Sequence, residues 1–530
     1  MATSFDAIIV GGGHNGLVTA AYLARAGRTV LVLEKRDLVG GCCITEEVWP
    51  GYRVSTAAYV NSLLRPEIVR DLELAKHGFE MIPRSPSSFT PFPDGRSLMM
   101  GPDKDLTRRE IAKFSAKDAD AYPKYEAMLT RVADFLEPLL VQTPPDPWGG
   151  VGDLLKLAKI GWKFRGLGRE VGSEAIEILT GAARPILDRW FESDELKATL
   201  ATDAVIGAYA PPSQPGTAYV LFHHVMGECN GVRGVWGYVK GGMGNVSESI
   251  AAAARKHGAV IRTNSPVGKI LVRAGRAYGV ALADGTEVHA RQIASCADAN
   301  VTFNKLTDAA DLPAEFRAAV NRIDYSSATV KINACLSGPP NFRALPNTGP
   351  TGIGPQHHGT MHVCPTMDYI ERGYEDAKAG RWARNPMLEC TMATALDPTL
   401  APPGKHVLSM FVQYAPYTLT GTTWAVEKDK FADRCFDVLE EYAPGFKASV
   451  IDRQVIPPPD MERLWGLTGG NIMQGAMSPS SMFSLRPAAG YANYRTPVKG
   501  LYLCGAAAHP GGGVMGAAGM NAAREMLKTR

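Results

Sequence analysis

Two clusters of glycine stand where a chain could bind phosphate. Gly11, Gly13 and Gly16 have the G-x-G-x-x-G spacing, and Gly511, Gly513 and Gly516 repeat it near the other end. Glycine at these places lets the backbone turn tightly and approach a pyrophosphate, whose charge is stabilised by the free N–H groups of a following helix. The spacing alone is weak evidence, so its meaning depends on the elements that flank it.

The first cluster lies between a predicted strand and a predicted helix. Phe5–Val10 is short, apolar and β-branched, which is typical of a buried parallel strand. Helical apolar spacing follows as far as Gly27, and a second buried strand, TVLVLE, ends in Glu34. An acid 23 residues after Gly11 can accept hydrogen bonds from ribose hydroxyls. This order predicts a Rossmann-like dinucleotide site, with Asn15 at the start of its helix.

A second glycine pair follows the acid, in the stretch EKRDLVGGCCITEE. Amine oxidases and phytoene desaturases carry a similar run, E-x-R-D-x-x-G-G-R-x-x-T/S, after the ribose acid. This resemblance implies FAD rather than NAD. Glu34, Arg36, Asp37, Gly40, Gly41 and Thr45 stand at the matching places, and the cofactor residues predicted in this stretch are Glu34, Lys35, Arg36, Gly40, Gly41 and Thr45. The chain departs from the pattern at Cys42, where those families usually carry Arg, so the resemblance implies no phosphate contact there.

The adjacent cysteines Cys42 and Cys43 raise a second interpretation, a redox-active disulfide. Disulfide reductases place a C-x4-C pair near this point, whereas Glu47 and Val48 occupy the positions five further on here. Adjacent cysteines form a strained ring and make a poor redox couple. We therefore interpret both as small residues packed near the cofactor.

The C-terminal glycine cluster has a different context. GLYLCG is a predicted buried strand, 511–516 a loop and 517–527 the last helix, with no further strand and no ribose acid after it. This is no second Rossmann unit. It resembles the C-terminal FAD motif of phytoene desaturases and amine oxidases, in which Gly505 precedes the loop and the N–H groups of Gly516 and Ala517 meet the flavin. No flavin-linking cysteine and no NADPH domain are recognised, so we expect noncovalent FAD.

The middle of the chain completes the same domain. A helix is predicted over 245–257, a strand over 260–262, and antiparallel strands over 267–272, 277–282 and 286–290, with Asp-Gly in one turn. QIASCAD then predicts one more buried strand. FAD enzymes of the glutathione-reductase type have a similar strand and meander, and this resemblance implies that the backbone of Val267 meets the adenine.

Strings along nearly the whole chain resemble one group of FAD proteins. They include SLLRPEIV, LFHHVMGE, GVWGYVKGGMG, LTGGNI and GLYLCGAAAHPGGGVMGAAGMNAA. The chain looks like the pyridine nucleotide-disulphide oxidoreductase domain-containing protein 2 group, within the phytoene dehydrogenase-related FAD proteins. The resemblance implies the fold and FAD and leaves the substrate open. The animal member of the group is mitochondrial.

The predicted fold class is α/β with two domains. An FAD-binding Rossmann-like domain of the glutathione-reductase and amine-oxidase type is predicted over the discontinuous segments 1–85, 232–300 and 485–530. A mixed α+β substrate domain is predicted over 86–231 and 301–484.

The composition limits the kinds of partner and compartment that we expect for the protein. The 530 residues carry a net charge of only +3, which creates no global field for nucleic acid. No apolar run reaches the roughly 18–20 residues that span a bilayer. The short stretch before the first strand leaves no room for a targeting peptide, and the nine scattered cysteines indicate reduced thiols. We expect a cytoplasmic bacterial protein; the oligomeric state is not indicated.

One lysine is a candidate catalytic residue. SSATVKINACLSG predicts a strand with Lys331 at its centre, and burying an unpaired ammonium is costly. Its faces are predicted as Val330, Ile332, Ala334 and Leu336 against Thr329, Lys331, Asn333 and Cys335. Amine oxidases carry a lysine in a similar strand, and the resemblance implies that Lys331 holds a water at the flavin and assists its reoxidation. The alternative is a lysine that reaches solvent from an edge strand.

Two further features each allow two interpretations. VGDLLKLAKIGWKFRGLGR predicts a helix with Lys156, Lys159 and Lys163 on one face and Leu154, Leu155, Ala158 and Trp162 on another. Such a helix can lie on a membrane, or it can cover a domain with a solvated outer face. His223 and His224 have no partner cluster with metal spacing, so we interpret them as core or cavity-lining residues and expect no metal.

Two functions follow. In the first, an FAD-dependent oxidoreductase takes hydride from a mostly apolar small molecule, and O2 or a quinone reoxidises the flavin. A desaturase is one subtype and an amine oxidase another, for which Tyr414 and Tyr417 are the available cage aromatics. In the second, the protein holds FAD without catalysis and acts through partners.

Overall fold

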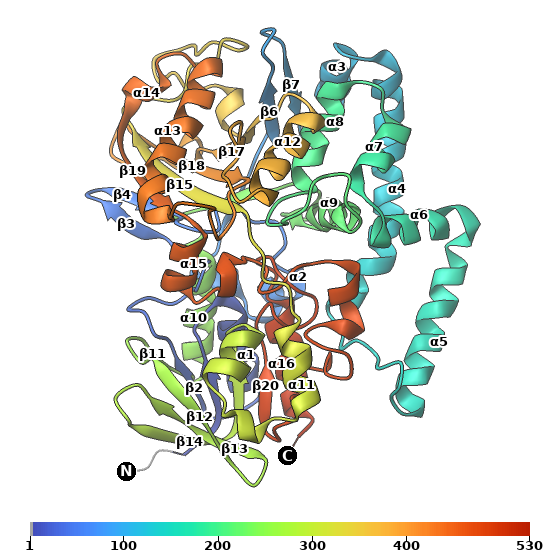
Figure 1. Ribbon diagram of the computed structural model, residues 1–530, viewed down its shortest axis with the longest axis vertical. Helices are drawn as coiled ribbons and strands as arrows, with labels where there is room; N and C mark the ends of the chain where they lie inside the picture. The colour runs from blue at the N-terminus through green and yellow to red at the C-terminus, as the bar shows by residue number, and fades with distance from the viewer. Residues whose placement is uncertain (1–3, 530) are drawn as a thin grey trace.

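The computed structural model of the protein describes residues 4–529, and two seven-stranded sheets organise it (Figure 1). The first sheet has the strand order β11-β2-β1-β14-β13-β12, with β20 paired to β14. Its strands are β1 (Phe5–Val10), β2 (Val30–Leu33), β11 (Val260–Arg262), β12 (Val267–Arg273), β13 (Arg276–Leu282), β14 (Glu287–Ser295) and β20 (Leu501–Leu503). These strands fall within the three segments predicted for the FAD domain, whose boundaries stay predictions.

Strand β14 corrects one expectation, because the last strand of the meander and the QIASCAD strand are a single element. Its residues 287–289 pair antiparallel with β13, whereas 290–295 pair parallel with β1. Residues 293–295 pair parallel with β20 on the other side. The chain runs straight from the meander into the parallel sheet, so no turn separates the two predicted strands.

The two ends of the chain meet through a helix pair. Helix α1 (His14–Arg25) packs against α10 (Gly244–Lys256) and α16 (Ala517–Leu527). A Cβ at Gly519 would lie 2.1 Å from the Asn15 carbonyl oxygen, so only glycine permits this approach of α16 to α1. Thr19 Oγ1 donates to the Gly519 carbonyl at 3.0 Å. The first and last helices therefore form one layer on the first sheet.

The second sheet has the order β19-β15-β18-β17-β16-β6-β7. Its strands are β6 (Ser88–Pro91), β7 (Ser97–Met100), β15 (Thr329–Leu336), β16 (Thr360–Val363), β17 (Met387–Thr391), β18 (His406–Gln413) and β19 (Val450–Ile456). Helix α13 (Trp424–Tyr442) covers one face, where Phe431 and Phe436 share a core with Val330, Ile332, Ala334 and Leu336. The alternation predicted for β15 is therefore confirmed, and on its other face Lys331 lines the cavity described below.

A helical layer stands beside the second sheet (Figure 1). It contains α3 (Lys104–Ala112), α4 (Ala116–Leu140), α5 (Val151–Gly166), α6 (Gly168–Thr180), α7 (Ala183–Trp190), α8 (Asp194–Asp203) and α9 (Thr217–Val225). The remaining helices are α2 (Pro66–Asp71), α11 (Ala314–Asn321), α12 (Met367–Lys378), α14 (Phe446–Ser449) and α15 (Pro458–Trp465). Short strand pairs are β3 (Glu46–Trp49) with β4 (Tyr52–Val54), β5 (Met81–Pro83) with β10 (Gly237–Val239), and β8 (Glu228–Cys229) with β9 (Val232–Arg233). Within residues 4–529, none of the helices combines the length and apolarity that crossing a bilayer requires.

Candidate active site

A cavity of about 1070 Å³ joins the two sheets. Its lining includes Gly11 and Gly13 from the first domain and Lys331 and Glu389 from the second sheet. Ligand pockets in proteins typically measure about 300–1,000 Å³. The cavity lies at the top of that range, which suits a large cofactor together with a second molecule.

The nucleotide end of the cavity is built for an anion. Gly11 has a φ of 96°, and Gly13 begins α1 with no side-chain cap and no acid in the first helical turn. The first N–H groups of α1 therefore lack side-chain acceptors and remain free for phosphate. A Cβ at Gly16 would lie 2.3 Å from the Gly11 carbonyl oxygen, so glycine there allows the helix to pack closely on the loop.

Glu34 stands beside this loop with its carboxylate already oriented. It is only 6% exposed, and its Oε2 accepts from the Gly12 N–H at 2.7 Å while Oε1 accepts from the Arg36 N–H at 2.9 Å. A carboxylate has about four acceptor sites, so capacity remains for ribose hydroxyls. The Gly40 N–H donates to the Gly12 carbonyl at 2.8 Å, which joins the second glycine pair to the first loop. These residues fit the adenosine and pyrophosphate parts of FAD.

Most of the predicted site residues line the cavity together. They are Gly11, Gly13, Asn15, Glu34, Lys35, Arg36, Gly40, Gly41, Val267 and Lys331. Burial lowers the pKa of Lys35. Arg36 forms an ion pair with Glu46 at 2.5 Å, so Glu46 neutralises part of the Arg36 charge.

The five other predicted residues, Gly16, Thr45, Gly505, Gly516 and Ala517, do not line the cavity. Thr45 Oγ1 accepts from the Gly244 N–H at 2.8 Å and so fixes the start of α10. A Cβ at Gly505 would lie 2.4 Å from the Cys296 carbonyl oxygen, which shows that Gly505 packs between two strand ends. Gly516 faces Ile68 of α2, and Ala517 is fully buried. The C-terminal residues that reach the cavity are instead Ala506, Gly513 and Val514.

The paired cysteines are packed thiols. Both line the cavity, and Cys43 is buried with its Sγ donating to the Met243 carbonyl at 3.2 Å. Burial raises the pKa of both thiols to about 12, which keeps them protonated at neutral pH. This arrangement agrees with the interpretation of small packed residues and gives no support to a redox disulfide.

The second sheet contributes a row of side chains across four neighbouring strands. Lys331 of β15 is paired with Phe411 of β18, Phe411 with Glu389 of β17, and Glu389 with His362 of β16. Directly paired residues in a sheet point to the same face. All four line the cavity, so the row forms part of its wall.

Lys331 is buried at the centre of the sheet. Its side chain is 1% exposed, and β15 pairs with both β18 and β19, so the edge-strand alternative is wrong. Its Nζ donates to Asn333 Oδ1 at 3.2 Å and to Ser409 Oγ, and lies 4.8 Å from the centre of the Tyr59 ring. Burial lowers the pKa of Lys331 to about 7, although the charge of Glu389 opposes this shift.

Glu389 is a buried acid beside the lysine. Tyr59 Oη donates to its Oε1 at 2.7 Å, while its Oε2 has no hydrogen-bond partner within residues 4–529. Burial, reinforced by the charge of Asp203, raises the pKa of Glu389 to about 7. Burial also raises the pKa of Asp203 to about 6 and lowers that of His362 to about 3. The cavity therefore holds groups that can exchange protons near neutral pH.

Several cavity residues are not predicted by any pattern in the sequence. Tyr59, Asp203, Glu389 and His362 carry no motif, and only strand register and helix packing bring them together. Tyr414 is buried with its Oη donating to the Ala210 carbonyl, and Tyr417 is partly exposed, so neither joins the cavity lining. Phe411 from the same stretch lines it, with its ring centre 5.9 Å from that of Tyr59.

The adjacent residues His223 and His224 have different surroundings. His224 lines the cavity and its Nδ1 is 2.8 Å from the Val220 carbonyl oxygen, whereas His223 is buried outside the lining. Burial lowers the pKa of His223 to about 3, so it is neutral. Within residues 4–529, no group of three or more His, Cys, Asp or Glu side chains is placed to hold a metal ion.

Comparison with known proteins agrees with this geometry. The family model described as flavin containing amine oxidoreductase matches residues 16–527. Pyridine nucleotide-disulfide oxidoreductase domain-containing protein 2 of Mus musculus is 46% identical over 544 residues, which cover 99% of this chain and 93% of the relative. Phytoene desaturase (lycopene-forming) of Pseudescherichia vulneris is 25% identical over 521 residues, 96% of each protein.

Solved structures agree on the fold. Wild-type putrescine oxidase bound to putrescine superposes with a TM-score of 0.59 at 15% identity, covering 99% of both chains. The predicted fold class, the predicted resemblance and the FAD cofactor are therefore confirmed. The chain belongs to the family of flavin containing amine oxidoreductases and is an FAD-dependent oxidoreductase.

Proposed function

We propose that the protein takes hydride from a mostly apolar small molecule held in the cavity, and that O2 or a quinone reoxidises the flavin. One continuous cavity carries this proposal, because it is lined both by the FAD loops and by Lys331, Phe411, Glu389 and His362. We call these four residues the Lys331 row. The cavity walls also carry many apolar side chains, among them Leu63, Leu200, Ile206, Leu221, Trp236 and Ile472. A phytoene desaturase among the relatives supports a hydrocarbon substrate.

The Lys331 row contains a group that can accept the proton that such a reaction releases. Bound FAD supplies the two-electron acceptor. Desaturation of a C–C bond removes a proton as well as a hydride from the substrate, and the proton needs a base. Glu389 Oε2 is buried, has no hydrogen-bond partner within residues 4–529 and belongs to a group with a pKa of about 7, so it suits this role. Tyr59 holds the other carboxylate oxygen and thereby orients the acid.

An amine substrate is the second candidate. The observation that favours it is the pair of acids, Glu389 and Asp203, in the same cavity, because a carboxylate pairs well with an ammonium. Arg84 lines this region too and is buried without an ion pair within residues 4–529. Together with Lys331 it already places two cationic side chains near the acids, which makes the site less favourable for a cationic substrate.

Anaerobic reduction of the holoprotein tests the two candidates. The flavin is mixed without oxygen with a panel of isoprenoid hydrocarbons and, separately, with primary and secondary amines, and bleaching of its absorbance is followed. We expect bleaching by a hydrocarbon, slowed strongly in Glu389→Gln, and rapid recovery of colour with air or a quinone. Bleaching by amines alone contradicts the apolar substrate. A photoreduced flavin that stays reduced with air and with quinones contradicts the proposed reoxidation.

A further inference from the structure

Helix α5 carries an apolar face that no other part of residues 4–529 covers. Val151, Leu154, Leu155 and Trp162 are 73%, 51%, 66% and 76% exposed, and Trp148 just before the helix is 78% exposed. Not one residue of the helix is buried. Contiguous exposed apolar side chains of this size mark interaction sites in soluble proteins. We name these five side chains the α5 ridge.

The ridge faces away from the protein. Leu157, Ile160 and Phe164 recur at helical spacing on the opposite side of α5 and are only partly exposed. The Phe164 and Phe135 rings have centres 5.7 Å apart, which places this inner side against α4. Figure 1 shows α5 standing out from the body of the molecule beside α6. The inner side thus serves packing, and the ridge is left for another partner.

Basic residues flank the ridge. The segment from Trp148 to Arg169 holds five basic residues, Lys156, Lys159, Lys163, Arg165 and Arg169, and one acid, Asp153, which gives a net charge of +4. The whole chain has a net charge of +3, so the remainder carries −1. Lys156 pairs with Asp153 at 2.9 Å, whereas Lys159 and Lys163 have no ion-pair partner within residues 4–529. This segment is therefore locally basic, although Asp146 and Glu170 lie just outside it.

We propose that the α5 ridge docks the protein onto an anionic membrane, with the helix lying in the interface. Trp148, Leu155 and Trp162 enter the boundary between headgroups and acyl chains, and Lys159 and Lys163 meet lipid phosphates. A membrane carries the complementary charge. A second copy of the chain would instead bring two segments of +4 together, which disfavours self-association through this face.

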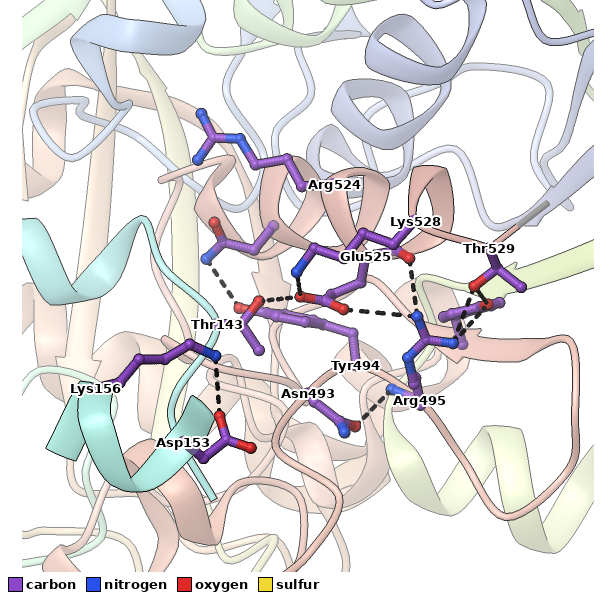
Figure 2. A network of polar contacts seen from close by, with 12 residues as sticks. Thr143, Asp153, Lys156, Asn493, Tyr494, Arg495, Arg524, Glu525, Lys528 and Thr529 are labelled. Atoms are coloured by element: carbon purple, nitrogen blue, oxygen red, sulfur yellow. Dashed lines mark hydrogen bonds and ion pairs between the residues drawn. The ribbon is translucent and has the colours of Figure 1, made fainter. Parts of the chain in front are cut away.

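The ridge has a fixed relation to the rest of the protein, because the segment before it is tied to the last helix. Figure 2 shows Thr143 meeting Glu525 of α16, where Thr143 Oγ1 donates to Glu525 Oε1 at 2.6 Å. Arg524 also donates to the Val141 carbonyl at 3.0 Å. Arg131 of α4 lines both the main cavity and a pocket of about 240 Å³ between α4 and α5. Docking thus brings the α4 side of the cavity toward lipid, which would serve the apolar substrate if the proposed function holds.

Vesicle co-sedimentation of the full-length holoprotein tests docking independently of any reaction. The probes are vesicles of phosphatidylcholine alone and of equal parts phosphatidylcholine and phosphatidylglycerol. We expect pelleting with the anionic vesicles and little with the neutral ones. Lys159→Gln with Lys163→Gln weakens binding roughly 30-fold, because each basic residue near an anionic surface contributes on the order of 1 kcal/mol. Leu155→Ser with Trp162→Ser weakens it at least tenfold.

Matched controls keep the test specific. Val426→Ser with Ile451→Ser removes exposed apolar side chains elsewhere, which are 57% and 53% exposed, and should leave binding unchanged. Circular dichroism and FAD content verify that every variant is folded. Equal binding of all variants, or no pelleting with anionic vesicles, overturns the proposal. So does light scattering that shows a lipid-free dimer which Leu155→Ser with Trp162→Ser converts to a monomer, because the ridge is then a subunit interface.

Discussion

Replacing Glu34 by alanine should weaken FAD binding by a calculable amount. The buried carboxylate accepts from Gly12 and Arg36 and retains lone pairs for the ribose. A hydrogen bond to a charged acceptor contributes about 1.5–3 kcal/mol. Its loss corresponds to a dissociation constant for FAD that is about 10- to 150-fold larger. The constant is measured by adding FAD to apoprotein and following the quenching of flavin fluorescence.

Part of that loss could come from the loop rather than from the ribose, because Glu34→Ala also leaves two backbone N–H groups without their acceptor. An FAD analogue with a 2′-deoxy adenosine ribose separates the two effects in a double cycle. The analogue should bind wild type about tenfold or more weakly than FAD, while Glu34→Ala binds both equally. Asp37→Ala, which removes an exposed acid three positions on, controls for charge alone. An unchanged dissociation constant in Glu34→Ala, or an analogue that wild type binds as tightly as FAD, refutes the assignment.

Three further predictions concern the second sheet and the cofactor. In stopped-flow oxidation by O2, Lys331→Met should slow reoxidation at least about tenfold while FAD stays bound; wild type should also slow as pH rises through about 7, where Lys331 loses its proton, and the variant should not. A variant that reoxidises at the wild-type rate dismisses the role of Lys331. Burial raises the pKa of Glu389 from 4.5 to about 7, so the folded protein retains a proton that the unfolded chain loses between these values. The contribution of Glu389 to stability in urea should therefore decline over this range by up to about 1.4 kcal/mol per pH unit, measured as the difference between wild type and Glu389→Gln, because Asp203 and the buried histidines add their own slopes to both proteins; parallel curves for the two proteins speak against it. Acid precipitation should release the yellow colour to the supernatant, and colour kept in the pellet contradicts noncovalent FAD.

The sequence by itself determined the FAD end of the protein. Phe5–Val10, the glycines after it and Glu34 lie within one β-α-β stretch, so local chain geometry alone brings them together. The last helix, 517–527, was predicted with the bounds that the structure has, because glycine ends its loop and helical spacing follows. The faces of β15 also followed from alternation, since a strand's period of two is a local property.

Tertiary structure decided what these elements meet. The Lys331 row combines strands that are far apart in the chain, and its register is set by pairing between them, which no local pattern encodes. Pairing on both sides of β15 buried Lys331, while the sequence allowed an edge strand equally well. Gly516 lies against Ile68 of α2, and Ala517 packs with Leu63 and Met515, so neither lines the cavity. The sequence predicts an amphipathic helix for α5. Only the arrangement of α4 and α6 leaves its ridge uncovered, because packing against neighbours determines which face of a helix is buried.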